Sequence, residues 1–175
     1  KEAFETIFEY AYDGMSLLKN GKIVSCNAAL VDMLRAKSKE EVIDSLPSEL
    51  STEYQDYQDH KELSSEKATR MINICFENGH HQFEWLHKRL NGEVFWAEIV
   101  LTRLLINNET VIHASWKDIS KRKILENALI SSNDKYKTLA NELDHRVKEQ
   151  AAQLIKQSKM AQMGELLSMI AHQWR

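Results

Sequence analysis

Cysteine is scarce in this chain, with only Cys26 and Cys75 among 175 residues. Two cysteines cannot build the disulfide framework of a small secreted domain, and no Cys or His pair has the spacing of a zinc site. We therefore expect no bound metal and a reducing, cytoplasmic setting.

The sequence also lacks any apolar run of about 18 residues, the length that a membrane-spanning helix needs. A formal net charge of −3 provides no basic field of the kind that nucleic-acid-binding proteins carry. We therefore expect neither a membrane span nor a nucleic-acid partner. Because the chain begins at Lys1 without an initiator Met, we expect it to be part of a longer protein, whose upstream segment could carry a membrane anchor.

Proline and glycine are few, and their positions divide the chain in two. The single proline is Pro47, and neither residue type occurs between Glu93 and Met163. Residues 1–118 hold 13 basic and 20 acidic side chains, whereas residues 119–175 hold 10 and 6. The first part is expected to be a domain of strands and short helices, and the second a long helix.

Three turn signals predict three hairpins in the first part. They are Asn20-Gly21, Asn91-Gly92 and Asn107-Asn108, each between two runs that favour strands. Asn and Gly adopt the positive φ angles that two-residue hairpin turns require. Five strands result, two before residue 27 and three after residue 79.

The stretch between these strand groups is expected to be helical. Residues 28–34 predict a short helix, and Ser38–Glu41 has the pattern of a capping box that opens another. A longer helix is predicted from Ser64 to Glu77, with Asn78-Gly79 as its C-terminal cap. The polar run from Ser51 to Glu66 is a candidate for a mobile lid.

Residues from 119 onward predict a helix of about 80 Å if they are helical throughout. Such a helix needs a partner for its apolar stripe, so we expect a parallel homodimeric coiled coil. Ser132, Arg146, Gln150 and Gln157 interrupt the stripe, which predicts a seam that is only weakly locked. The stripe consists of Leu125, Leu129, Tyr136, Leu139, Leu143, Val147 and Leu154.

Three short segments, in this order and spacing, resemble PAS sensor domains. They are Asn20–Asn27 (NGKIVSCN), Asn91–Trp96 (NGEVFW) and the exit motif Asp118–Ser120. The resemblance implies an α+β PAS fold over residues 1–118, a five-stranded antiparallel sheet with flanking helices, followed by a long coiled-coil helix.

The C-terminal block, residues 157–175 (QSKMAQMGELLSMIAHQWR), resembles the first helix of the dimerisation and phosphotransfer domain of sensor histidine kinases. Leu143–Glu149 (LDHRVKE) resembles the linker helices that precede that block, and we assign residues 119–156 to a coiled-coil signalling linker. The resemblance implies that His172 is the phosphoacceptor. In many of these kinases an acidic residue follows the histidine and is thought to act as a base, whereas here that position is Gln173. An amide can orient an imidazole but cannot take its proton, so the role implied for Gln173 is to orient His172.

The spacing around His172 agrees with that role. Apolar residues recur there at intervals of three and four, as in a heptad seam, and with the first at position a His172 falls at the outward position f. An outward imidazole can be reached by an ATP-bearing domain and can attack the γ-phosphorus. A plain solvent-exposed histidine is the alternative. The seam residues are Met160, Met163, Leu167, Ile170 and Trp174.

The kinase resemblance implies a parent enzyme, an ATP-dependent protein histidine kinase that signals to a cognate response regulator. The sequence contains no Gly-rich lid and no Asp-x-Gly-x-Gly motif. ATP would therefore be bound by a separate domain of the parent, and we expect this chain alone to be inactive. The alternative is a PAS and coiled-coil dimerisation module that serves another output without phosphotransfer.

PAS domains bind ligands between the sheet and the long helix, so the resemblance implies a pocket there. Strand alternation predicts which side chains face it, and Leu101, Ile112 and Ala114 share the strand faces of the candidates named below. An ordinary core is the alternative. Haem-binding PAS domains usually place their axial His on the long helix, and Ser64–Glu77 contains no His, so the resemblance disfavours haem. Photochemical flavin PAS domains need a Cys on the preceding helix, and Leu50–Glu62 contains none, so it disfavours flavin photochemistry as well. A small molecule or a non-covalent flavin stays open. The pocket candidates are Phe83, Trp85, His87, Ala97, Ile99, Trp116, Ile72 and Cys75.

Three polar residues carry specific expectations. We expect His87 either to be a satisfied core histidine or to pair with the carboxylate or carbonyl of a small ligand. Asp118 and Arg122, four residues apart where the last strand meets the long helix, are expected to pair and to transmit the signal. Plain helix capping by Asp118 is the alternative.

Overall fold

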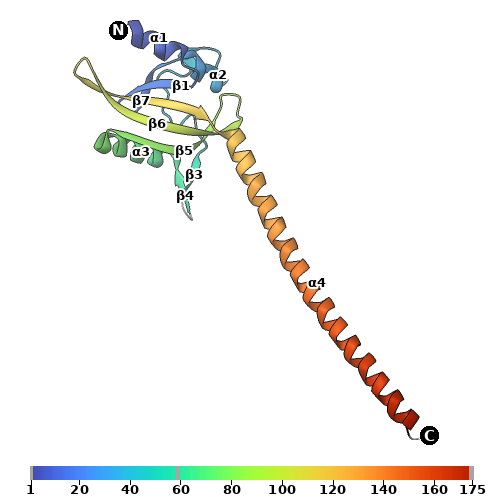
Figure 1. Ribbon diagram of the computed structural model, residues 1–175. Helices are drawn as coiled ribbons and strands as arrows, with labels where there is room; N and C mark the ends of the chain where they lie inside the picture. Colours follow the sequence, from blue (N-terminus) through green and yellow to red (C-terminus); the bar gives the residue numbers. More distant parts are fainter. Residues whose placement is uncertain (1, 58–59, 174–175) are drawn as a thin grey trace. The chain divides into compact units, whose positions relative to one another are not determined.

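The computed structural model describes residues 2–57 and 60–173 (Figure 1). These residues form two compact units, Lys1–Ile124 and Leu125–Arg175. The first unit contains every strand, and the second is helical.

A five-stranded antiparallel sheet forms the centre of the first unit, in the order β2-β1-β7-β6-β5. The sheet confirms the predicted α+β class and the five predicted strands. Its strands are β1 (Gly14–Lys19), β2 (Lys22–Cys26), β5 (His80–Lys88), β6 (Val94–Ile106) and β7 (Glu109–Asp118). Because β1 and β7 pair in the middle, the first and last strands of the domain lie side by side.

Two of the three predicted hairpin turns have the expected geometry. Asn20 and Gly21 have φ angles of 53° and 80°, and Asn107 and Asn108 have 52° and 61°. These positive values allow a two-residue turn to follow the twist of the strands. The turn at Asn91-Gly92 is longer than predicted, because Arg89 donates its backbone N–H to Glu93 across a wider loop.

Short helices fill the connection between β2 and β5. They are α2 (Ala28–Met33), a 3-10 turn η1 (Lys39–Glu41) and α3 (Ser64–Asn78). Gly79, with φ of 84°, ends α3 as predicted. The predicted capping box at Ser38 is wrong, because its side chain makes no capping hydrogen bond and only the 3-10 turn follows.

A second, two-stranded sheet was not predicted. Its strands, β3 (Tyr54–Tyr57) and β4 (His60–Leu63), lie in the polar run that sequence reasoning treated as a helix or lid. The buried Gln55 side chain accepts from Leu86 N–H at 2.9 Å and donates to Leu86 C=O at 2.8 Å. This side-chain amide therefore pairs with the outer edge of β5 as a neighbouring strand would, next to the bridge between Ser51 and His87.

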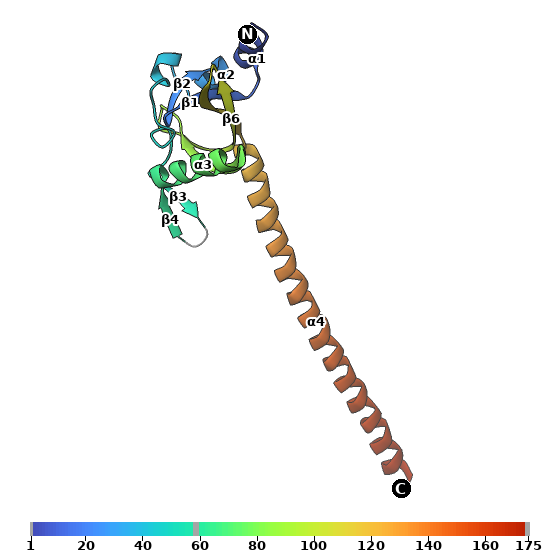
Figure 2. The ribbon, with the colours of Figure 1, turned by 90° about the vertical axis from the view of Figure 1, so that its left-hand side faces the viewer.

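Helices cover both faces of the main sheet. Figures 1 and 2 show α3 on one face and α1 (Glu2–Tyr10) on the other. On the α1 side, the Phe8 and His113 rings meet edge to face with centroids 6.4 Å apart. On the α3 side lies the apolar core, with Met71 and Cys75 of the helix buried against it.

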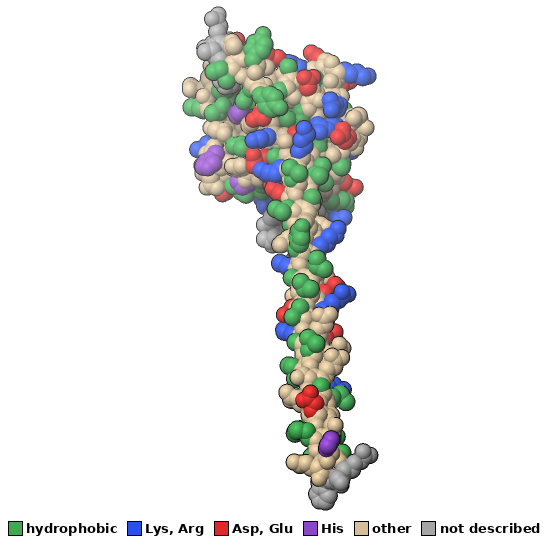
Figure 3. Space-filling model, turned by 45° about the vertical axis from the view of Figure 1, so that its right-hand side comes forward, with side chains coloured by type: hydrophobic (Ala, Val, Ile, Leu, Met, Phe, Trp, Pro, Cys, Tyr) green, Lys and Arg blue, Asp and Glu red, His purple; other side chains and the backbone are tan. Residues whose placement is uncertain are grey.

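The last element is α4, a helix of 54 residues from Ser120 to Gln173. The stripe and seam side chains that lie within it are between 52% and 71% exposed in the single chain. Trp174, the last seam residue, lies outside the described residues. Hydrophobic side chains are visible along the surface of the helix in Figure 3. Over the described residues, no helix combines the length and apolarity of a membrane span.

Candidate ligand cavity and helix junction

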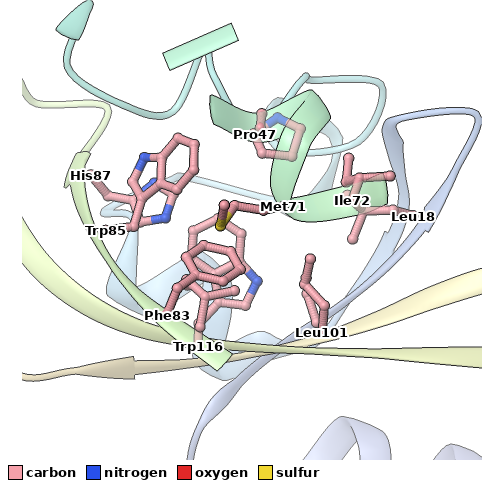
Figure 4. A pocket seen from close by; sticks show the side chains of 12 residues that line it. Leu18, Pro47, Met71, Ile72, Phe83, Trp85, His87, Leu101 and Trp116 are labelled. Carbon is pink, nitrogen blue, oxygen red and sulfur yellow. The ribbon is translucent and has the colours of Figure 1, made fainter. Parts of the chain in front are cut away.

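A small cavity of about 30 Å³ lies between the sheet and α3 (Figure 4). Its wall is apolar apart from two indole nitrogens and one imidazole. It is lined by Leu18, Pro47, Ala68, Met71, Ile72, Phe83, Trp85, His87, Ile99, Leu101, Ala114 and Trp116.

The structure brings six of the eight predicted pocket residues to this wall: Ile72, Phe83, Trp85, His87, Ile99 and Trp116. Ala97 is fully buried in the core beside the cavity, where its methyl group does not reach the wall. Cys75 is buried one turn further along α3, with its thiol sulfur 3.9 Å from the carbonyl oxygen of Gly79. Both residues belong to the core and not to the cavity.

Several wall residues were missed. Ala68, Met71 and Ile72 follow the three- and four-residue spacing of one helix face. Ala68 and Met71 could therefore have been predicted to line the cavity together with Ile72. Leu101 and Ala114 were not missed: they share the strand faces of Ile99 and Trp116, as expected from alternation, and they line the wall. Pro47 comes from an irregular loop, and no local pattern indicates its position.

His87 is the central polar residue of the wall. It is 2% exposed and packs among the rings of Trp85, Phe95 and Trp116, with the Trp116 centroid 4.3 Å away. Burial lowers the pKa of His87 to about 3, despite the opposing effect of a hydrogen bond to Leu50. The ring is therefore neutral near pH 7.

The tautomer of His87 follows from its contacts. Nδ1 lies 2.8 Å from the carbonyl oxygen of Leu50 and 3.2 Å from Ser51 Oγ. A carbonyl oxygen can only accept, so Nδ1 carries the proton and donates. The other ring nitrogen, Nε2, keeps its lone pair.

The first turn of α4 is tied to the sheet by Asp118. Its Oδ1 accepts from Ser120 N–H at 2.9 Å, and its Oδ2 pairs with an Arg89 guanidinium nitrogen at 2.6 Å. Burial alone would raise the pKa of Asp118, but the hydrogen bonds from Ser120 and Arg89 hold that pKa below its ordinary value. Arg89 also stacks over Phe95, with 4.0 Å between the guanidinium carbon and the ring centroid.

Arg122 makes a different contact from the one predicted. It pairs with Glu84 of β5 at 2.6 Å and with Glu98 of β6 at 3.6 Å. Lys123 also pairs with Glu84, and its hydrogen bond is the main cause of the lowered pKa of Glu84. The predicted Asp118–Arg122 pair is therefore wrong, because the sheet offers Arg122 two carboxylates while Arg89 and Ser120 occupy Asp118.

His81, near the start of β5, packs against an aromatic ring and a thioether. His81 stacks on Phe83 with centroids 5.2 Å apart, and its Nε2 lies 3.2 Å from the sulfur of Met71. Within residues 2–57 and 60–173, no group of three or more His, Cys, Asp or Glu side chains could hold a metal ion.

His172 and Gln173 are both exposed in the last turn of α4. At about 100° per residue, His172 lies on the side of the helix opposite Met163, Leu167 and Ile170. A second histidine of α4, His145, is also exposed.

A family model described as PAS domain matches residues 13–121. No protein among curated sequences matches this chain significantly. The matched span contains the whole main sheet, the cavity wall and the first residues of α4.

Solved structures give the same result. The PAS domain of an HTR-like protein from Haloarcula marismortui is 21% identical, with a TM-score of 0.53 over 67% of this chain and 90% of its own. A PAS domain from Colwellia psychrerythraea is 18% identical, with a TM-score of 0.57 over 69% and 97%. A PAS domain from a two-component sensor histidine kinase is 13% identical, with a TM-score of 0.53 over 67% and 94%.

Sequence identities of 13–21% show that these proteins share a fold with this chain, but they do not show a shared function. The family model, however, covers more than half of the chain, and the strand order, the α3 cover and the cavity all lie in its span. This chain belongs to the PAS domain family.

Proposed function

We propose that this chain is the sensory and transmitter part of a two-component sensor histidine kinase. In this proposal the cavity of the PAS domain is the input site, α4 is the transmitter, and His172 is the phosphoacceptor. The observation that carries it is the continuity of α4, one helix from the exit of the sheet to His172.

Two routes of direct contact support an input at the cavity. On one side of β5, Phe83, Trp85 and His87 line the cavity, while Glu84 between them pairs with Arg122 and Lys123 of α4. At the end of β5, His87 packs on Phe95, Phe95 on Arg89, and Arg89 pairs with Asp118. A change in the cavity that shifts β5 would therefore act on the first turn of α4.

The apolar stripe of α4 supports a homodimer. Side chains such as Leu129, Leu139 and Leu143 are at least 60% exposed in the single chain, which is costly in water. A second copy in parallel would bury these side chains in a coiled coil. His172 would then remain outside the seam and open to an ATP-bearing domain.

Further partners follow from the proposal. The parent kinase supplies the ATP-binding domain, and a cognate response regulator receives the phosphoryl group. We place the chain in the cytoplasm, where ATP and the response regulator are found. A titration with nucleic acid should show no binding.

The test is phosphoryl transfer to this chain from radiolabelled ATP, with the ATP-binding domain of the parent kinase supplied in trans. Label should appear on the wild type, be stable to base and labile to acid, and be absent from His172→Ala. His145→Ala is the matched control, because it removes an exposed histidine from the same helix and should keep the label. Absence of label from a folded, dimeric chain would favour a dimerisation module for another output.

A further inference from the structure

The donors in the cavity wall are already used by the protein. Trp85 Nε1–H donates to Ser51 Oγ at 2.7 Å, and Trp116 Nε1–H donates to Ser16 Oγ at 3.0 Å. His87 Nδ1–H donates to Leu50. The remaining nine wall residues have no nitrogen or oxygen in their side chains. A ligand that needs to accept a hydrogen bond from these side chains would find no free donor.

One acceptor is left. With its proton on Nδ1, the neutral ring of His87 has a lone pair at Nε2, and this is the only side-chain nitrogen of the wall that can accept. The residue is 98% buried, so bulk water does not readily satisfy that lone pair. A buried acceptor without a partner costs free energy, which a donor placed in the cavity would recover.

A single water molecule fits this site poorly. The cavity of about 30 Å³ exceeds the roughly 10–15 Å³ that one water needs, and an ordered buried water makes two to four hydrogen bonds. The side chains of the wall offer one. The surface around it consists of hydrocarbon and aromatic rings, which favours an occupant with an apolar body.

We propose that the cavity takes a small, uncharged molecule with a hydroxyl donor on an apolar body of one or two carbons, and that His87 Nε2 accepts from it. The inference rests on the proposed sensory role of the cavity and names the ligand class. It replaces the expectation that His87 pairs with a carboxylate or carbonyl, since both groups need a donor. It also disfavours flavin, because a cavity that holds even benzene is about 150 Å³.

The test is an isomer comparison on the full chain in the same buffer. Ethanol, dimethyl ether and acetate are the three probes: the first two share a formula but only ethanol donates, and acetate carries a charge. Binding is followed by the ¹⁵N shift of His87 Nε2 and the indole signals of Trp85 and Trp116. Trp96, outside the cavity wall, is the internal control for solvent effects.

Ethanol should shift the His87 and cavity indole signals saturably, while dimethyl ether binds about three- to tenfold more weakly, the worth of one hydrogen bond. Acetate should not bind. In His87→Phe, which keeps an aromatic ring but removes the acceptor, the two isomers should bind equally. Where that variant does not fold, the ¹⁵N spectrum of the wild type gives the tautomer, and a proton on Nε2 would overturn the proposal.

The remaining outcomes separate this inference from the proposed function. If dimethyl ether or acetate binds as well as ethanol, the donor class is wrong, and the cavity can still be the input site. If none of the three probes shifts the cavity signals, the ligand class is refuted, and the proposed function is still tested by the labelling of His172. Phosphorylation of His172 is independent of either result.

Discussion

Gly14 shows how closely β1 and α2 approach each other. A Cβ atom on Gly14 would lie 3.1 Å from Leu30 Cδ1 and 3.2 Å from Trp116 Cβ, tighter than ordinary van der Waals contact. Since Trp116 belongs to the cavity wall, a methyl group here presses on the candidate site. Crowding of this kind typically costs about 1–3 kcal/mol.

We therefore expect Gly14→Ala to lower the stability of the sensory domain by about 1–3 kcal/mol. The measurement is urea unfolding followed by tryptophan fluorescence. Gly164→Ala is the matched control, because nothing lies within 4 Å of its added Cβ and alanine favours the helix. Equal midpoints for Gly14→Ala and the wild type would mean that β1 and α2 can separate without cost.

His87 predicts a dependence of stability on pH. Burial lowers its pKa in the folded chain to about 3, against about 6.5 when unfolded. Between these values the unfolded state binds a proton that the folded state does not, so stability falls as pH drops from about 6.5 toward 3. His87 alone therefore contributes a slope in the free energy of unfolding that approaches about 1.4 kcal/mol per pH unit.

The measurement is urea unfolding at pH 7, 6, 5 and 4, with His87→Phe as the comparison. His81 and His113, whose pKa values burial also lowers, add a slope of the same sign in both proteins. The difference between the two slopes therefore belongs to His87. Parallel curves for the two proteins would show that folding does not lower the pKa of His87.

At the scale of elements, the junction between β7 and α4 depends on one carboxylate. Asp118 caps Ser120 N–H and pairs with the buried Arg89 at 2.6 Å, while Glu93 pairs with the same Arg89 at 3.3 Å and is 56% exposed. Loss of a helix cap costs about 1 kcal/mol, and loss of a charged hydrogen bond adds to it.

We expect Asp118→Ala to destabilise the sensory domain by about 2–3 kcal/mol and Glu93→Ala by less than about 0.5 kcal/mol. Thermal or urea unfolding of the two variants measures the difference. Hydrogen exchange should also show faster opening of the first turn of α4 in Asp118→Ala only. Equal effects of the two substitutions would mean that Arg89, and not the cap, governs the junction.

The elements found from sequence are those with strong local signals. The Asn-Gly and Asn-Asn turns, the apolar period of α3 and the Gly79 cap each depend on residues a few positions apart. The β3–β4 hairpin had no such signal, because its attachment depends on Gln55 meeting Leu86, 31 residues away. Arg122 was misassigned for the same reason: its partner Glu84 is 38 residues distant.

At the scale of the whole chain, a folded sensor and a long helix share one continuous backbone. The fold class and the cavity wall followed from alternation and from the resemblance to PAS domains. The proposed role of α4 depends on a partner, because its apolar stripe has nothing to pack against within the described residues 125–173.

The stripe of α4 gives the last prediction. Most of the stripe lies in two rows of residues seven positions apart. One row is Leu129, Tyr136, Leu143 and the polar Gln150. The other alternates apolar and polar residues, Leu125, Ser132, Leu139 and Arg146. In a parallel dimer these three polar residues interrupt the seam, which leaves it weakly packed. Replacing all three with leucine adds buried apolar surface worth about 1 kcal/mol or more per site.

The triple variant Ser132→Leu, Arg146→Leu and Gln150→Leu should therefore lower the dimer dissociation constant at least about tenfold, measured by sedimentation equilibrium. Asp134→Leu, Asn141→Leu and Lys148→Leu form the matched control, since these positions fall on the outer face and should leave dissociation unchanged. In the complete protein, if it is the kinase proposed above, the seam variant should also reduce the response of phosphorylation to the input, because a weak seam would let the two helices change their packing. A tighter dimer that signals normally would mean that the signal reaches His172 without repacking the seam.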